Sequence, residues 1–424
     1  MLYYIIRPLT YLGLLAFCKK IYLTNTKSIP KDRPVILACN HPTAFLEPCI
    51  LASFTNRPLH FLVRGDFFKH PFYRKLMYSL NLIPIYRSTN ANYQELKRNI
   101  ELMDIIGRKL NENITLMILV EGSASVKKGL RPIQKGIARL AFDVYEQYGR
   151  DDLEIIPVGA NFDDPTRFRM TPMINFGQKL AIKDYRSIHQ TNKKKAIRKL
   201  MQDIEQGMRN NIIHVEDEAD TWLVEQQLLL LRNESKLNRF PIVERQTDRL
   251  EKEVALAAQI NQMTAREKQL LQTDTKRYFR ALADQKLRDS GLFEPTRWWH
   301  LPLLILGFPI FAIGTLFNGL PPYLGNTIAQ KKVKRIQYVM PVAWGISNLS
   351  YAFYWLLLLL LASMTQSVFA ILLVLALPFM GYFAIVYYEI LTAWRSSKRW
   401  EQCSDSDRTH LQKLRAAAVA PFGR

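Results

Sequence analysis

A long stretch without charged residues constrains this chain more than any other feature. Between Arg335 and Glu389 the sequence contains no Asp, Glu, Lys or Arg. The interval holds two apolar runs separated by the polar break ASMTQS, and each run reaches the roughly 20 residues that a helix needs to cross a bilayer. Trp355 and Trp394 are of the kind that gathers at membrane interfaces. The sequence therefore predicts a transmembrane hairpin over 331–396 rather than a hairpin buried in a soluble domain.

The apolar run before this hairpin is interrupted by prolines. Residues 301–325 are apolar but contain four prolines. If this run crossed the membrane, the basic segments KKVKR and WRSSKRW would lie across the bilayer from the preceding domain; if it is re-entrant, they share the domain's side, which the positive-inside rule favours. We therefore expect a re-entrant or interfacial segment over 297–330 and a polar tail over 397–424. The protein is then an integral membrane protein, with the preceding domain on the cytoplasmic face.

The first residues of the chain are also apolar. The segment MLYYIIRPLTYLGLLAFCKK is interrupted by Arg7 and Pro8, has no basic region before its apolar part, and has no clear cleavage site. These features are typical of an uncleaved helix at a membrane interface rather than a signal peptide. We expect a membrane-associated helix within 1–29, and a core helix of the first domain is the alternative.

Residues 30–182 alternate between apolar runs and helical patterns. This order predicts an α/β domain with a central mixed sheet flanked by helices. Residues 183–296 are rich in Lys, Arg, Glu, Gln and Leu and predict a helical region. Strands are expected over 34–40, 59–65, 81–87, 114–122 and 153–162, and helices over 70–80, 92–110, 134–148, 192–211, 243–263 and 265–287.

Composition narrows the classes of partner. There are 58 Lys and Arg against 37 Asp and Glu, for a formal charge of +21, which favours an anionic partner such as a phospholipid membrane. Nucleic acid is not favoured, because no aromatic RNA-binding platform or zinc finger is present, and the membrane hairpin explains a basic face. The four cysteines and seven histidines show no metal-ligand spacing, so no metal site is predicted.

A histidine at the end of a predicted strand is the first candidate for chemistry. His41 follows the run VILACN, and Glu47 lies six positions further on. A neutral histidine can remove a proton from an alcohol, and a carboxylate can fix its tautomer and stabilise the imidazolium. His41 and Glu47 are therefore a candidate base with its orienting acid. A polar loop that only closes the strand is the alternative.

A second polar block follows the strand expected over 114–122. Its basic, glycine-containing loop leads into a helix, and backbone N–H groups at a helix start together with flexible cations suit a phosphate. Arg87 ends another predicted strand. As alternatives, Arg87 could cap its strand, Glu121 could bond backbone N–H groups, and the lysines could be solvated. The candidate substrate-binding residues are Arg87, Glu121, Gly122, Ser123, Lys127, Lys128 and Arg131.

In their order along the chain, these blocks resemble the glycerolipid acyltransferase family. The first block in the family is a histidine, four intervening residues and an aspartate; here it is His41, five intervening residues and Glu47. The second resembles NLIPIYR with Arg87, and the third, usually Phe-Pro-Glu-Gly, reads LVEG over 119–122. The fourth is matched loosely by IPV over 156–158. The resemblance covers residues 30 to 180.

The resemblance implies a membrane-bound enzyme that moves a fatty acyl group from acyl-CoA or acyl carrier protein to glycerol-3-phosphate or lysophosphatidate. His41 would deprotonate the acceptor hydroxyl and Glu47 would orient His41, while Arg87, Glu121, Gly122 and the nearby lysines would hold the phosphate. No cofactor beyond the acyl donor is implied. The alternative is a non-catalytic lipid-binding or membrane-organising protein on the same scaffold, favoured by glutamate at position 47 and by the missing Phe-Pro.

Overall fold

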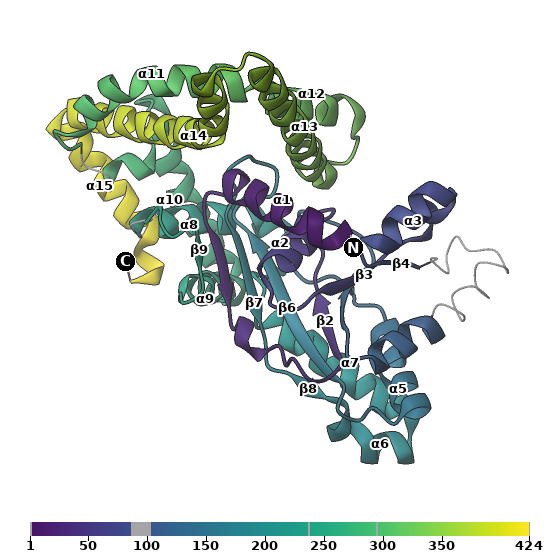
Figure 1. Ribbon diagram of the computed structural model, residues 1–424. Coiled ribbons are helices and arrows are strands. Elements are labelled where there is room, and N and C mark those ends of the chain that lie inside the picture. Colours follow the sequence, from purple (N-terminus) through teal and green to yellow (C-terminus); the bar gives the residue numbers. More distant parts are fainter. Residues whose placement is uncertain (1, 86–102, 236–237, 294–295, 424) are drawn as a thin grey trace. The chain divides into compact units, whose positions relative to one another are not determined.

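The computed structural model describes residues 2–85, 103–235, 238–293 and 296–423. The chain divides into two compact units. Unit 1 contains residues up to His214, together with 239–251 and 334–341, and unit 2 contains the remaining residues. The first unit is an α/β domain and the second is helical, as the ribbon shows (Figure 1).

A mixed sheet forms the centre of unit 1. Its order is β4-β3-β5-β2-β6-β7-β1-β9, and β8 pairs with β6. The pairings of β6 with β7 and with β8 are antiparallel and the others are parallel. The predicted central mixed sheet flanked by helices is confirmed. The strands are β1 (Ile21–Thr24), β2 (Val35–Cys39), β3 (Leu59–Arg64), β4 (Leu82–Ile85), β5 (Thr115–Leu119), β6 (Glu154–Phe162), β7 (Pro172–Phe176), β8 (Leu180–Ala181) and β9 (Val243–Glu244).

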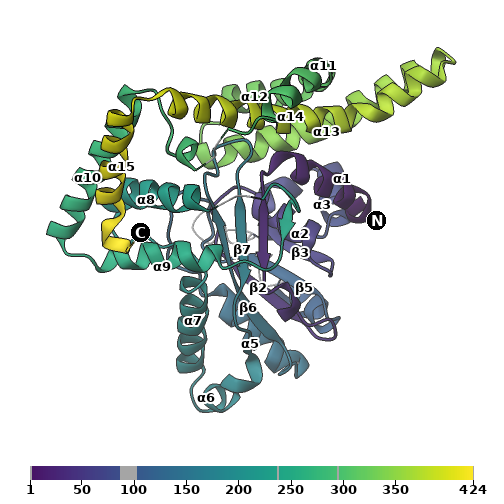
Figure 2. The ribbon, with the colours of Figure 1, turned by 90° about the vertical axis from the view of Figure 1, so that its left-hand side faces the viewer.

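Helices cover both faces of this sheet, with α1 and α2 on one side and α7 on the other (Figure 2). Side chains of α5 and α7 form one core with Ile36 and Ala38 of β2. Residues 103–111 are also helical, and the earlier part of the helix predicted over 92–110 lies outside the described residues. The helices of unit 1 are α1 (Leu2–Phe17), α2 (Leu46–Phe54), α3 (Pro71–Ser79), α5 (Gly136–Tyr148), α6 (Arg186–Thr191) and α7 (Lys193–Arg209).

The N-terminal helix α1 is anchored to unit 1 and also exposes apolar side chains. Arg7 donates to the carbonyl of Thr55 at 2.5 Å, and the ring of Tyr11 contacts that of Phe54. Its outer face leaves Ile5 and Leu12 each 63% exposed. The helix therefore combines both readings made from sequence, since one face packs on the domain and the other suits a membrane interface.

Two features of unit 1 differ from the boundaries expected from sequence. α7 lies beyond residue 182 but packs on the sheet domain, because Ala196, Leu200 and Ile204 form a buried stripe along it. The helix predicted over 243–263 begins only at Arg249, and its first residues form β9 instead. β9 pairs with β1 and forms that edge of the sheet, and Lys20 and Glu244 form an ion pair there at 2.7 Å.

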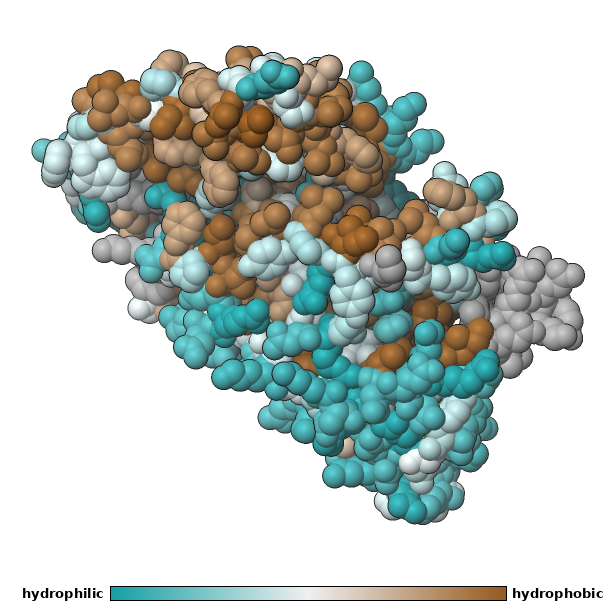
Figure 3. Space-filling view, in the orientation of Figure 1, coloured by the Kyte–Doolittle hydropathy of each residue, from teal (hydrophilic) through white to brown (hydrophobic). Residues whose placement is uncertain are grey.

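Unit 2 contains α8 and α10, much of α9, and the apolar helices. Its core joins Leu230, Tyr278 and Leu282 to Trp400 and Val419 near the end of the chain. The space-filling view shows hydrophobic surface over the region of α11, α13 and α14 (Figure 3). The helices are α8 (Thr221–Glu234), α9 (Arg249–Gln262), α10 (Ala265–Asp284), α11 (His300–Asn318), α12 (Leu320–Lys332), α13 (Ile336–Met364), α14 (Val368–Gln402) and α15 (Asp405–Val419).

Among the described residues, three helices are long and apolar enough to cross a membrane: α11, α13 and α14. The predicted hairpin corresponds to α13 and α14. The segment predicted to be re-entrant or interfacial corresponds to α11 and α12, and α11 qualifies as a span by length and composition alone.

Candidate active site

The strand that leads to His41 lies in the middle of the sheet. β2 pairs in parallel with β5 on one side and β6 on the other, and all five of its residues are buried. Asn40 follows directly. Its side-chain amide donates to the carbonyl of Ala160 at 2.9 Å and accepts from the N–H of Ala160 at 2.7 Å. The Asn40 side chain thus continues the pairing with β6 after β2 has ended. The backbone can then leave the sheet at Asn40, while this residue stays held in place.

His41 and Glu47 meet across the turn between β2 and α2. Nδ1 of His41 lies 2.6 Å from Oε1 of Glu47. Glu47 sits in the first turn of α2 and is fully buried, and the His41 side chain is 12% exposed. An ionised carboxylate can only accept, so this contact places the hydrogen on Nδ1 and leaves the lone pair on Nε2. A longer carboxylate at a wider spacing therefore still reaches the imidazole.

Thr43 supports this pair, and sequence reasoning missed it. Its hydroxyl donates to Oε2 of Glu47 and accepts from the N–H of Leu46 at 3.1 Å. The second bond satisfies one of the N–H groups left open at the start of α2. Thr43 thus fixes both the helix start and the second oxygen of Glu47. A threonine just before an apolar helix, with a glutamate in its first turn, is the signal that could have found it.

Glu121 joins the loop of His41 to the loop that follows β5. Its side chain is 2% exposed and accepts from the backbone N–H of His41 at 2.7 Å and from that of Arg131 at 2.8 Å. The Arg131 guanidinium also donates to it at 2.9 Å. Glu121 therefore has the geometry of a structural carboxylate that bonds backbone N–H groups, which is the alternative considered from sequence. In this position Glu121 holds the backbone of the candidate base.

Arg131 and Ser123 belong to the same hydrogen-bonded loop as Glu121. The guanidinium donates to the Ser123 hydroxyl at 2.8 Å and to the Ser123 carbonyl. Between Glu121 and Ser123 the chain turns at Gly122, whose φ of +69° is a conformation that residues with a Cβ rarely adopt. Glu121, Gly122, Ser123 and Arg131 thus form one folded loop beside His41.

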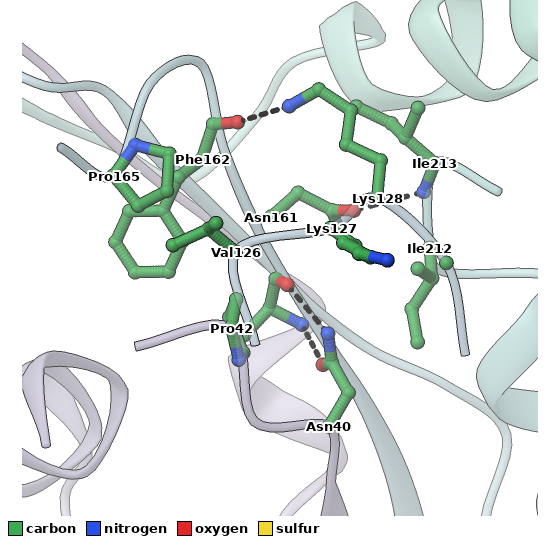
Figure 4. Close-up of a pocket in the computed structure, with 12 residues that line it drawn as sticks. Asn40, Pro42, Val126, Lys127, Lys128, Asn161, Phe162, Pro165, Ile212 and Ile213 are labelled. Carbon is green, nitrogen blue, oxygen red and sulfur yellow. Dashed lines mark hydrogen bonds between the residues drawn. The ribbon is translucent and has the colours of Figure 1, made fainter. Parts of the chain in front are cut away.

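The two lysines of this loop line a small cavity beside Asn40 and Pro42 (Figure 4). The cavity measures about 20 Å³, which is room for one water molecule. Nζ of Lys128 donates to the carbonyl of Phe162 at 2.7 Å. The structure therefore brings Lys127 and Lys128 next to the His41 loop. Arg87 lies outside the described residues.

Two cysteines lie near the pair but are poor nucleophiles. Burial, with Glu47 and then Glu121 nearby, raises the pKa of the Cys39 thiol well above its usual range. Burial, with a contribution from Glu47, raises the pKa of Cys49 to about 12. A thiol reacts as its thiolate, so both groups are unreactive near neutral pH. Among the described residues, no group of three His, Cys, Asp or Glu could hold a metal ion.

The part of the chain that carries this site is similar to a known family. Residues 20–161 match the family model described as Acyltransferase. This segment, about a third of the chain, is similar to an acyltransferase domain. It runs from the β1 region to Asn161 in β6, and it contains His41, Glu47, Glu121 and both lysines. The acyltransferase domain thus provides every candidate catalytic residue, while unit 2 lies outside the match.

One curated protein and one solved structure are similar to parts of this chain. An uncharacterized acyltransferase of Schizosaccharomyces pombe is 25% identical over 91 residues, which are 21% of this chain and 14% of that protein. The chain therefore spans only a small part of the length of this curated relative. The 1-acyl-sn-glycerophosphate (LPA) acyltransferase PlsC of Thermotoga maritima has 15% identity and a TM-score of 0.35, covering 48% of this chain and 77% of that one.

Proposed function

We propose that this protein is a membrane-bound O-acyltransferase that transfers a fatty acyl group from acyl-CoA or acyl carrier protein to glycerol-3-phosphate or lysophosphatidate in phospholipid synthesis. The observation that carries the proposal is the contact between His41 and the buried carboxylate of Glu47. The acyltransferase domain and the basic loop beside the pair support it.

The proposed reaction begins at Nε2 of His41. This atom takes the proton of the acceptor hydroxyl, and Glu47 stabilises the imidazolium that forms. The acceptor oxygen attacks the thioester carbonyl, the bond from carbon to sulfur breaks, and the leaving thiolate takes up the proton. Both nearby cysteines have raised pKa values, which favours direct transfer without an acyl-cysteine. Holding both substrates in place supplies much of the acceleration.

The acceptor phosphate is proposed to bind beside the His41 loop. Lys127 and Lys128 provide cations there, with Arg87 as a further candidate from sequence. Arg131 is bonded to Glu121 and Ser123, so we assign these three to positioning the loop. The catalytic domain is proposed to face the cytoplasm, because the basic segments that flank the membrane hairpin favour that side.

Purified protein in phospholipid micelles tests the proposal. Acyl transfer is measured for glycerol-3-phosphate and lysophosphatidate, each with acyl-CoA and with acyl carrier protein as donor. We expect turnover with at least one pair and loss of that turnover in His41→Ala. Absence of transfer for all four pairs, with intact lipid binding, would instead favour the non-catalytic lipid-binding alternative. Full activity of folded His41→Ala would reject the mechanism.

A further inference from the structure

Within unit 2, the segment before α11 is bonded to the end of α14. The indole N–H of Trp400 donates to the carbonyl of Arg288 at 2.7 Å, and Arg399 donates to the carbonyl of Lys286 at 3.2 Å. Gly291 packs so closely on Trp400 that an added Cβ would lie 2.3 Å from its ring. These contacts require residues 286–291 and residues 399–400 to be on the same face of any membrane.

This shared face fixes how many times the intervening helices cross. α13 and α14 form a hairpin, and two crossings return the chain to the face from which α13 starts. The start of α13 and the segment before α11 are therefore on one face, so α11 and α12 together must cross an even number of times. α12 has 13 residues and ends in Lys331 and Lys332, so it spans about 20 Å and is too short and too polar to cross. The even number is then zero.

The depth of the turn between α11 and α12 follows from the register of its contacts. Asn318 accepts from the hydroxyl of Tyr351 on α13 at 2.5 Å and packs against Gly381 on α14. Tyr351 precedes Thr365 by 14 residues and Gly381 follows Ser367 by 14, so both contacts lie about 21 Å from the tip of the hairpin along the helix axes. A hydrocarbon core is about 30 Å thick, so the turn ends inside the near leaflet.

α11 also approaches α14 at a slant. Tyr387 of α14 donates to the carbonyl of Leu304 at 2.7 Å, whereas the end of α11 at Asn318 reaches Gly381. Fourteen residues of α11 therefore pass beside only six of α14. The two helices are therefore not aligned residue for residue along their shared contact.

We propose that α11 and α12 form a re-entrant pair embedded in a single phospholipid leaflet, and that the protein crosses the membrane twice. The partner of the pair is the acyl-chain region of the leaflet on the side of Lys331. The exposed apolar side chains of α11 support this partner. They lie on several sides of the helix and include Leu306, which is 78% exposed, Leu316 at 74% and Ile305 at 63%. The packing of these helices agrees with the sidedness predicted from the distribution of basic residues, and this topology does not depend on the proposed enzyme activity.

Single cysteines labelled in sealed vesicles test this topology. In a background with the native cysteines replaced, Trp298→Cys, Lys331→Cys, Thr365→Cys and a restored Cys403 are treated with a membrane-impermeant maleimide. We expect the cysteines at 298, 331 and 403 to label from one face and the cysteine at 365 from the other. Labelling of the cysteines at 298 and 331 from opposite faces would overturn the proposal, as would labelling of all four from one face.

A second measurement keeps all native cysteines, in case their replacement prevents folding. A protease site inserted between Lys331 and Lys332 should be cut only from the face that exposes the C-terminal tail. The depth of position 320 is measured with a nitroxide attached to Leu320→Cys in the cysteine-free background. Oxygen should relax the nitroxide strongly by collision, and a water-soluble nickel complex should relax it weakly. Strong relaxation by the nickel complex at position 320, with the cut site on the opposite face, would indicate that α11 spans.

Discussion

Nδ1 of His41 and Oε1 of Glu47 lie 2.6 Å apart, although six positions separate the two residues in the chain. The turn between them leaves room for Thr43 to bind the other oxygen of the carboxylate. The spacing and the length of the glutamate therefore fit each other. Substitutions at either residue should therefore have large effects on the contact and on activity.

Shortening Glu47 to aspartate should lower kcat, because the carboxylate would withdraw from the imidazole by about one carbon–carbon bond. Glu47→Gln keeps the length but offers an amide in place of the charge, and should lower kcat by about 10²–10⁴-fold, in the range of general-base catalysis. Steady-state kinetics with purified protein measure both. Glu112→Gln, on an exposed glutamate, is the control. A gain of activity in Glu47→Asp would show that the native pair is not tuned around glutamate.

Thr43→Val should lower both stability and kcat, since it removes one bond to the helix start and one to Glu47. Loss of stability should be about 1–2 kcal/mol. Thr55→Val is a matched control at the other end of α2, where the hydroxyl donates to the carbonyl of Leu51 at 2.8 Å. It should cost similar stability and leave kcat unchanged. Equal effects of both variants on kcat would contradict a positioning role for Thr43.

Lys127→Ala and Lys128→Ala should raise KM for a phosphate-bearing acceptor by about tenfold or more, because a charge-assisted hydrogen bond contributes about 1.5–3 kcal/mol. The effect on KM should exceed the effect on kcat. Lys194→Ala, which removes an exposed lysine on α7, is the control. A fall in kcat at constant KM, or no change with either lysine, would move the phosphate site elsewhere.

His60 should make the fold sensitive to acid. Burial, and then the nearby charge of Lys109, lowers the pKa of His60 to about 4 from its usual 6.5. Between these values the unfolded chain binds a proton that the folded protein does not, so stability falls as pH falls from about 6.5 to about 4. His60→Gln should lose less melting temperature over this interval than the wild-type protein. His410→Gln, on an exposed histidine, should retain the full loss, and an unchanged slope in His60→Gln would refute the assignment.

Direct transfer predicts that no acyl group becomes attached to the protein. Rapid quenching during turnover with a radiolabelled donor should leave the denatured chain unlabelled, and Cys49→Ser should keep normal kcat, because the pKa of Cys49 is raised to about 12. Label that hydroxylamine releases from the protein, and that disappears in Cys49→Ser, would establish an acyl-cysteine instead.

The sequence predicts β2 to β6 because these strands are continuous apolar runs between strongly periodic helices. It misses β1, β7 and β8, and it also misses β9, whose two residues have no period to detect and pair with β1. The end of α7 shows the same limit: an added Cβ at Gly159 of β6 would lie 2.0 Å from the carbonyl of Asn211. Such a close approach depends on how distant parts of the chain pack together, so a local sequence pattern does not show it.

The candidate site is predictable in its residues but not in their division of labour. His41 and Glu47 can be paired from sequence, but their distance depends on α2 beginning at Leu46, which Thr43 helps to fix. Glu121 and Arg131 look like substrate contacts from their motif. In the structure the Glu121 carboxylate is bonded to the backbone of His41 and to Arg131, because the loop folds back on itself.

The charge-free interval between Arg335 and Glu389 has a consequence for how the protein enters its membrane. With a re-entrant α11 and α12, the segment of the described residues that biosynthesis must translocate is the tip of the hairpin, Thr365–Ser367, which carries no charge. Every lysine and arginine of the chain can stay on the side where it is made. Insertion then needs no passage of a charged side chain, whose cost at the bilayer centre is about 2.5–3.5 kcal/mol each on the translocon scale.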